Sequence, residues 1–226
     1  ELLNKPFGSF IHPDDRERML EYNRARNRGE YAPSTYEFRA IKNNGDIVYF
    51  DASVNLITYK GESAALAFLK DITERKKAEQ ALKDSEIKYR SIFENAVEGI
   101  FQSTPEGRFN SVNPAMARMC GFESPEEMIL SVTDIKNQHY VKPEERDEYR
   151  RIMDANGVVE NFEHQIYRKD GAKIWVSTNS RAVKDENGNV LFYEGTHENI
   201  TKRKNIEDAL KKNEAMLQSI LRASAV

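Results

Sequence analysis

Cysteine is almost absent from this chain, which has Cys120 as its single example in 226 residues. One cysteine excludes an internal disulfide framework and is typical of a protein in a reducing compartment. Long apolar runs are absent too, because no stretch approaches the roughly 20 apolar residues that a membrane-spanning helix needs. We therefore expect a cytoplasmic segment that makes no membrane contact itself, although a longer parent protein could be anchored elsewhere.

An excess of positive charge is also missing. The chain has 34 Lys and Arg against 37 Asp and Glu, a net charge of -3. A nucleic-acid-binding domain normally presents a basic face, so nucleic acid is not an expected partner. The chain starts with Glu1 and has no basic segment followed by an apolar run, so we expect a fragment of a longer protein without a signal peptide.

Catalytic and metal-binding spacings are lacking as well. The four histidines and one cysteine are scattered and match no metal-ligand spacing. The sequence shows neither a nucleophile with its base nor a glycine-rich phosphate loop. Paired acids at Asp14-Asp15 and Glu144-Glu145 precede predicted helices, where they complement the helix dipole. We expect no enzyme activity and no metal site in this chain.

An internal repeat is the dominant feature that the sequence does contain. Ile72–Ile92 aligns with Ile200–Ile220 at an offset of 128 residues, and eleven of the 21 positions are identical. The match extends upstream, from Tyr36-Glu37-Phe38 to Phe162-Glu163-His164. A repeat longer than half the chain leaves no room for two whole copies. The sequence therefore predicts one complete module preceded by the C-terminal part of another.

These offsets set the expected domain organisation. Residues 1–73 would be the C-terminal part of a first module, and about 42 residues would be missing from its front by comparison with the second copy. Residues 74–92 would form a helical linker and 93–201 the complete module. Residues 202–226 would form a second helical linker that runs into the start of a next module.

The complete copy has the pattern of an α+β domain. Short apolar runs at 99–104 and 109–113 predict a hairpin, and Asn113-Pro114 and Ser124-Pro125 each open a short helix. A longer helix is expected from Pro143 to Asn156, and then three strands at about 159–167, 173–183 and 190–200. Five antiparallel strands with helices on one face follow. A tight turn at Asp170-Gly171 would place Trp175 on the same sheet face as His164.

Both linkers carry apolar residues at the alternating spacing of a coiled-coil seam. A seam predicts pairing of two copies of the helix, with a small polar residue fixing the register. The alternative is an amphipathic helix packed on its own domain, because two heptads are short for a coiled coil. The seam residues are Ala78, Leu82, Ser85, Tyr89 and Ile92 in the first linker and Ile206, Leu210, Asn213, Leu217 and Ile220 in the second.

Several of these motifs resemble PAS sensor domains. Pro105-Glu106-Gly107-Arg108 and Asn113-Pro114-Ala115 are similar to the opening of that family, and Lys169-Asp170-Gly171 with Asn187-Gly188 is similar to its C-terminal half, often called PAC. The resemblance implies the PAS fold and a tandem array upstream of a histidine kinase, a diguanylate cyclase or a similar output domain. The linkers are most similar to those of multi-PAS sensor histidine kinases.

The resemblance also implies a signal-exit motif at the end of each copy. In the family an Asp-Ile-Thr sequence joins the last strand to the signalling helix, and its Asp caps that helix and pairs with a nearby basic residue. The matching residues are Asp71, Ile72, Thr73 and Arg75 in the first copy and Asn199, Ile200, Thr201 and Arg203 in the second. Because Asn199 is uncharged, the cap is expected there and the ion pair is not.

Two roles for the complete module remain open. A small molecule could bind between sheet and helices, where the residues expected to line a pocket are Phe101, Met116, Met119, Tyr149, His164 and Trp175. Alternatively, the module is a ligand-free dimerising relay whose core Phe101, Met119, Phe122 and Trp175 fill. Partners would be a second copy of the chain and a downstream output domain.

Tightly bound cofactors are disfavoured. Photoactive flavin-binding relatives need a cysteine within an Asn-Cys-Arg-Phe run, and Cys120 lies in a different context. Haem-binding relatives use a histidine on the long helix, and residues 143–156 contain none, although His139 lies just before them. The incomplete first module raises a separate expectation: its last strand, at about 63–72, has an open apolar edge that another chain, an exchanged segment or the linker helix would cover.

Overall fold

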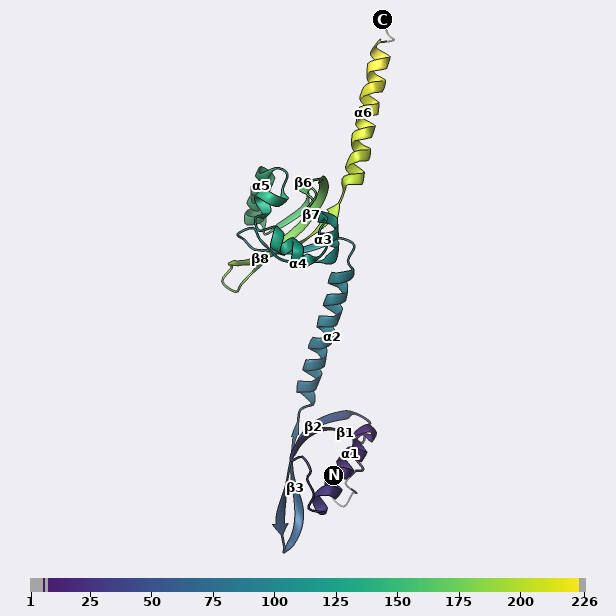
Figure 1. Cartoon of the computed structure of the whole chain (residues 1–226), viewed down its shortest axis with the longest axis vertical. Coiled ribbons are helices and arrows are strands. Elements are labelled where there is room, and N and C mark those ends of the chain that lie inside the picture. The colour runs from purple at the N-terminus through teal and green to yellow at the C-terminus, as the bar shows by residue number, and fades with distance from the viewer. Residues whose placement is uncertain (1–5, 7, 224–226) are drawn as a thin grey trace. The chain divides into compact units, whose positions relative to one another are not determined.

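The computed structural model describes residue 6 and residues 8–223 (Figure 1). The chain divides into two compact units, Glu1–Ile87 and Lys88–Val226. Helix α2, Thr73–Asn95, begins in the first unit and ends in the second. Within the described residues, no helix combines the length and the apolar character needed to cross a bilayer.

The first unit is a three-stranded antiparallel sheet with helix α1 packed on it, followed by the first part of α2. It contains α1 (Pro13–Asn27), β1 (Thr35–Ile41), β2 (Ile47–Tyr59) and β3 (Glu62–Asp71), and the strand order is β1-β2-β3. Asp15 at the start of α1 accepts from the Arg39 backbone and guanidinium at 2.9–3.0 Å, which fixes the helix on β1. Met19 and Phe38 lie in the small core between them.

The second unit has a five-stranded antiparallel sheet in the order β5-β4-β8-β7-β6. Its strands are β4 (Gly99–Ser103), β5 (Phe109–Val112), β6 (Val158–Tyr167), β7 (Lys173–Lys184) and β8 (Val190–Asn199), and its helices are α3 (Pro114–Cys120), α4 (Pro125–Ser131), the π-helical turn η1 (Ile135–His139), α5 (Pro143–Asn156) and α6 (Thr201–Ala223). The expected α+β class, five antiparallel strands with helices on one face, is confirmed.

Side-chain capping explains why the short helices begin where they do. Asn113 accepts from the Met116 amide at 2.8 Å, and Ser124 accepts from the Glu127 amide at 3.2 Å. Each cap is followed by proline at the first helical position, where its missing N–H costs nothing. At the other end, Gly121 has φ 81°, a left-handed conformation that stops α3. The short helices α3 and α4 form the side of the core that faces the sheet.

The pairing of β6 with β7 differs from the tight-turn prediction. The strands are joined by residues 168–172, a five-residue loop, and the register pairs His164 with Val176 and Gln165 with Trp175. The observed pairing differs by one residue from the predicted pairing, and such a shift moves every side chain of one strand to the other face. Trp175 therefore lies on the opposite face of the sheet from His164. With the observed register, His164 and Val176 are buried on the inner face, and Gln165 and Trp175 are half-buried on the outer face.

Candidate functional site

The inner face of the second unit's sheet is unusually polar for a protein core. Thr178 Oγ1 lies 2.9 Å from His197 Nδ1, and Ser180 Oγ lies 2.9 Å from the Tyr149 hydroxyl. Both strand residues are buried, as is His164 beside them. Buried polar groups normally mark a structural or functional constraint, because each must be satisfied to be tolerated. The interior of this unit is therefore the first place to look for a site.

Three of the chain's four histidines meet in that interior. His139 comes from η1, His164 from β6 and His197 from β8. The rings of His139 and His197 stack with centroids 5.9 Å apart, and His164 meets the His197 ring edge-on at 5.8 Å. Tyr140 stacks on His164 at 4.4 Å. The sequence separates these residues widely, so only the fold brings them together.

Burial keeps the three imidazoles neutral. Desolvation lowers the pKa of His139 to about 3 and the pKa of His164 to about 4. The pKa of His197 is also held well below its ordinary value, first by burial and then by its two histidine neighbours. A neutral imidazole has one N–H and one lone pair, and at neutral pH this cluster carries no charge of its own.

Arg146 brings a positive charge to the same interior. It lies on α5, is 4% exposed, and places its guanidinium 4.5 Å from the Tyr149 ring centroid and 5.7 Å from that of Tyr140. Its charge further lowers the pKa of His139 and of His164. Sequence reasoning missed Arg146, although it precedes Tyr149 and Met153 at helical spacing on the buried face of α5.

The start of α6 is fixed to the sheet by an ion cluster. Glu163 on β6 lies 2.7 Å from Arg203 Nη2 and 2.5 Å from Lys204 Nζ, both in the first turn of α6. These contacts lower the pKa of Glu163, first through Lys204 and then through Arg203. Lys204 also lies over the Trp175 ring at 5.3 Å. Trp175 therefore supports the helix start and does not line the interior, which corrects its expected place in a pocket.

The same cluster recurs where α2 leaves the first unit. Glu37 on β1 lies 2.7 Å from Arg75 Nη2 and 2.6 Å from Lys76 Nζ. The position of Glu37 corresponds to that of Glu163 in the repeat, and Arg75 and Lys76 correspond to Arg203 and Lys204. In each unit, a glutamate on a strand (β1 in the first unit, β6 in the second) thus binds an arginine and a lysine at the start of the outgoing helix.

The exit motifs cap these helices and do not supply the ion pairs. Asp71 Oδ1 accepts from the Thr73 amide at 2.9 Å, and Asn199 Oδ1 accepts from the Thr201 amide at 3.0 Å. The resemblance implied an ion pair between Asp71 and a nearby basic residue. In the structure Glu37 forms the ion pair with Arg75, and Asp71 caps the start of its own helix. Thr201 Oγ1 also accepts from the Trp175 amide at 2.9 Å. Ile72 and Ile200, the middle residues of the two motifs, are buried.

The end of α2 is held by one buried asparagine. Asn113 is fully buried; its Nδ2 donates to the carbonyl oxygens of Phe93 and Glu98 at 3.0 Å. Its Oδ1 accepts from the amides of Ile100 and Met116 at 2.9 and 2.8 Å. The amide group of the Asn113 side chain thus links the end of α2 to β4 and to α3.

Two family models match the chain at these units. Residues 97–202 match the model described as PAS domain, and residues 1–68 match the one described as PAS fold. The fold is the PAS fold. In the second PAS unit, the polar interior lies between the sheet and helices α3 to α5, and α2 and α6 are its incoming and outgoing helices.

Curated relatives of this PAS-containing chain include two proteins named as kinases. The sensor histidine kinase TmoS of Ectopseudomonas mendocina is 22% identical over 150 residues, which are 65% of this chain and 15% of that protein. Sporulation kinase E of Bacillus subtilis is 22% identical over 155 residues, 69% of this chain and 20% of the relative. The chain thus spans a fifth or less of the length of these two relatives.

A solved structure of a PAS domain also matches this chain. The PAS domain of an HTR-like protein from Haloarcula marismortui is 19% identical, has a TM-score of 0.45, and covers 55% of this chain and 99% of its own.

Five of the six predicted pocket residues surround the PAS interior. Phe101 contacts the His197 ring at 4.7 Å, and Phe101 and Met116 belong to the main core with His164 close by. Tyr149 is fully buried, and Met119 is partly buried against the same core. His139, His197 and Arg146 complete the site. Whether this group binds a ligand stays a proposal.

His139, His164, His197 and Cys120 are buried side chains of this unit that could ligate a metal ion. In the described part of the chain, no group of three or more His, Cys, Asp or Glu side chains is placed to hold a metal ion. The rings of His139 and His197 stack, whereas His164 meets the His197 ring edge-on. Cys120 is buried, and burial raises the pKa of its thiol to about 12, so it stays protonated.

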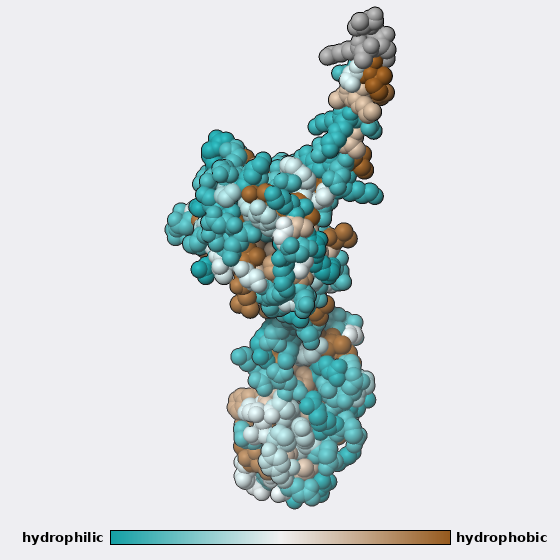
Figure 2. All heavy atoms as spheres, turned by 45° about the horizontal axis from the view of Figure 1, so that its top comes forward, coloured by the Kyte–Doolittle hydropathy of each residue, from teal (hydrophilic) through white to brown (hydrophobic). Residues whose placement is uncertain are grey.

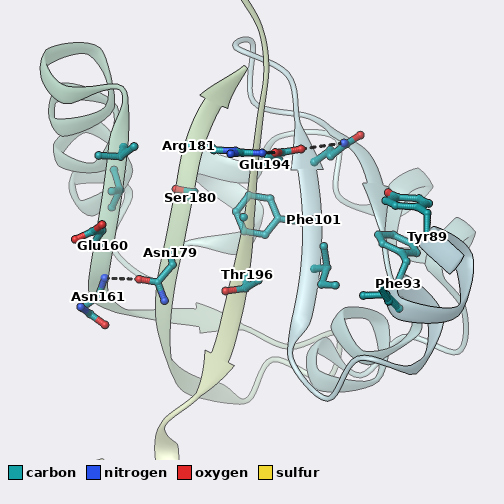
Figure 3. Close-up of a pocket in the computed structure, with 16 residues that line it drawn as sticks. Tyr89, Phe93, Phe101, Glu160, Asn161, Asn179, Ser180, Arg181, Glu194 and Thr196 are labelled. Carbon is teal, nitrogen blue, oxygen red and sulfur yellow. Dashed lines mark hydrogen bonds and ion pairs between the residues drawn. The ribbon is translucent and has the colours of Figure 1, made fainter. Parts of the chain in front are cut away.

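The outer face of the PAS sheet carries a groove of about 630 Å³ (Figure 3). On one side lie Tyr89 and Phe93 of α2, whose rings stack at 5.7 Å. Across the strands, Arg181 donates to Glu194 at 2.6 Å, and Asn161 donates to Asn179 at 2.8 Å. The groove is distinct from the histidine interior, because it lies on the opposite side of the sheet.

The predicted seam residues lie on α2 and α6 and face solvent. Helix α2 has no buried residue along its 23 positions. Leu82 is 63% exposed and Leu210 is 58% exposed, and Figure 2 shows apolar residues on the surface of α6. The other seam residues, Ala78, Ser85, Tyr89, Ile92, Ile206, Asn213, Leu217 and Ile220, are exposed too. The stripe is therefore largely exposed, although Tyr89 and Ile92 also border the outer groove of the sheet.

Proposed function

We propose that this chain is a sensory relay segment with two PAS modules in tandem, in which the second module receives a signal through α2 and passes it on through α6. The observation that carries the proposal is the repeated attachment of an outgoing helix by Glu37 or Glu163. Near its start, helix α6 is held to the sheet by Glu163 and Trp175. A change in the sheet would therefore move or release the helix.

Dimerisation is the second part of this function. An exposed leucine costs free energy in water, and a stripe of them on a helix is stabilised by pairing with another helix. We infer that α2 and α6 each pair with the same helix of a second copy. A paired helix can transmit a small rotation or register shift, which is what a relay needs.

The output of the parent protein is inferred as a histidine kinase, because TmoS is named a sensor histidine kinase and sporulation kinase E is named a kinase. A cytoplasmic location fits this output. In this reading the PAS interior is the sensing site: a small molecule bound there shifts the relay through its different affinity for the two states.

Oligomeric state tests the relay directly. We expect the chain to be a dimer by light scattering at micromolar concentration, and Leu82→Glu to shift it toward monomer. Ile87→Glu is a matched control, because Ile87 is equally exposed on α2 but lies off the seam. A monomeric wild type, or equal effects of the two variants, would contradict the proposal.

A further inference from the structure

Strand β3 of the first unit has an unprotected edge. It is ten residues long and pairs with β2 along one side, and among the described residues no strand lies along its other side. The opposite edge of this sheet is bridged, because Ile11 pairs with Ala40 of β1. Proline and bulges are common protections for an edge, but β3 has no proline and keeps one register with β2 throughout. Its open edge is therefore a template for another strand.

The turn between β2 and β3 fixes which backbone groups of β3 point to that edge. Lys60 and Gly61, with φ of 53° and 86°, form a two-residue turn. Tyr59 and Glu62 lie opposite each other on either side of it. A two-residue hairpin turn is closed by a hydrogen-bonded pair, and bonded and non-bonded pairs then alternate along the strands. The even-numbered residues of β3 thus bind β2, and the odd-numbered residues 63–71 direct their N–H and C=O groups outward.

Charge selects one register when two copies of β3 are set side by side in antiparallel fashion. Because odd-numbered residues must face odd-numbered residues, the two-fold axis passes through a residue. With the axis at Leu66, Glu62 of each copy lies opposite Lys70 of the other, so two opposite-charge pairs form. With the axis one residue nearer the turn, Lys60 would lie opposite Lys70. With the axis one residue the other way, Glu62 and Lys70 would both face uncharged side chains.

Side-chain size fits the same register. With Leu66 opposite itself, Phe68 of one copy faces Ala64 of the other, and Leu69 faces Ser63. Phe68 is 64% exposed in the single copy, and Leu69 and Leu66 are exposed as well. Cross-strand neighbours are the unit of sheet stabilisation, and a large side chain opposite a small one avoids crowding. The pairing would cover apolar surface that the chain alone leaves in water.

We propose that β3 pairs antiparallel with β3 of a second copy of this chain, about a two-fold axis at Leu66, and joins two three-stranded sheets into one. The interface is isologous, since the same strand serves both copies. Antiparallel strands put the two starts of α2, at Thr73, roughly 45 Å apart at opposite ends. The copy that pairs through β3 is therefore a different one from the copy that pairs in parallel through α2, and the inference does not rest on the relay.

Disulfide trapping tests the register. Under mild oxidation Leu66→Cys should cross-link to itself, because residues opposite each other in a non-hydrogen-bonded pair have Cα atoms about 4.5 Å apart, within disulfide range. Ala64→Cys should not cross-link to itself but should do so when mixed with Phe68→Cys. The native Cys120 is buried. No cross-link in Leu66→Cys, or equal self-cross-linking at all three positions, would overturn the proposal.

Charge reversal tests the same pairing without cysteine. Analytical ultracentrifugation from micromolar to millimolar concentration uses the Leu82→Glu chain, so that α2 pairing does not contribute. We expect Glu62→Lys and Lys70→Glu each to raise the dissociation constant about tenfold, because both charge pairs become repulsive. The double reversal should return it to within about threefold of the parent. Glu17→Lys, a reversal at an exposed position of α1, is the control and should change nothing. A parent that stays monomeric at every concentration, or a double reversal no better than the single ones, would overturn the proposal.

Discussion

Arg75 Nη2 lies 2.7 Å from Glu37 Oε1, and Arg203 Nη2 lies the same 2.7 Å from Glu163 Oε1 in the second unit. The two clusters share their geometry. In both, the lysine that follows the arginine binds the second carboxylate oxygen. Exposed ion pairs contribute little to stability, so we attribute the repetition to the need to fix the direction of the outgoing helix.

Replacing Glu163 by Gln should loosen the start of α6. We expect a small loss of global stability, about 0.5–1 kcal/mol, because the cluster is partly exposed. The larger effect should be faster amide hydrogen exchange in the first turn of α6. Glu160→Gln on the same strand is the control, since Glu160 is exposed and distant from α6 in register. Equal exchange in the two variants would show that Glu163 does not hold the helix.

Acid should destabilise the second unit through its histidines. The pKa of His164 is about 4 and that of His139 about 3 in the folded state, against about 6.5 in an unfolded chain. The unfolded state therefore binds more protons between these values. Stability should be full above pH 6.5 and fall as pH drops toward 4, by about 1.4 kcal/mol per pH unit for each histidine.

Urea unfolding between pH 4.5 and 8 measures this dependence. His164→Phe should reduce the slope by about one proton, because one group that titrates only in the unfolded state has been removed. A stability that stays flat over the same range would mean that the imidazoles are hydrated or already charged in the folded protein.

Asn113→Ala should be among the most damaging single substitutions in the second unit. It leaves the amides of Ile100 and Met116 and the carbonyls of Phe93 and Glu98 without partners. We expect a loss of about 3 kcal/mol in the free energy of unfolding. Asn110→Ala, at an exposed position of β5, should change it by less than about 0.5 kcal/mol. Similar losses for both would refute the role of Asn113.

The free edge of β3 should be covered by another polypeptide. In the second unit β8 pairs with β4 on the corresponding edge, whereas β3 has a described partner only in β2. Phe68 is 64% exposed and Leu69 43% exposed on this strand, and an open apolar edge recruits partners. We expect association that Phe68→Lys weakens, or strong binding of a hydrophobic dye. A monomer with low dye binding would contradict this.

Much of the fold could be predicted from the repeat. Asn113-Pro114, Ser124-Pro125 and Pro143 marked helix starts that the structure has, because caps act over a few residues. The register of β6 and β7 could not be read from Asp170-Gly171, since the loop has five residues and the parity of the pairing depends on its length. This one-residue difference in register places Trp175 on the outer face of the sheet.

The interior shows a different limit. His139, His164 and His197 could each be named from the sequence, but their meeting depends on η1 lying over β6 and β8. Arg146 had a signal in its spacing to Tyr149, which the high charge of α5 obscured.

Hydrogen exchange in Asn113→Ala tests most directly whether the second PAS module couples α2 to α6. Asn113 touches the end of α2, and Lys204 donates its amide to Ile200 at the start of α6. Met128→Ala, a core truncation on α4, is the control for lost stability alone. We predict faster exchange at Lys204 and Asn205 in Asn113→Ala than in Met128→Ala. If the increase in Asn113→Ala stays confined to residues 93–116, the module does not connect the two helices.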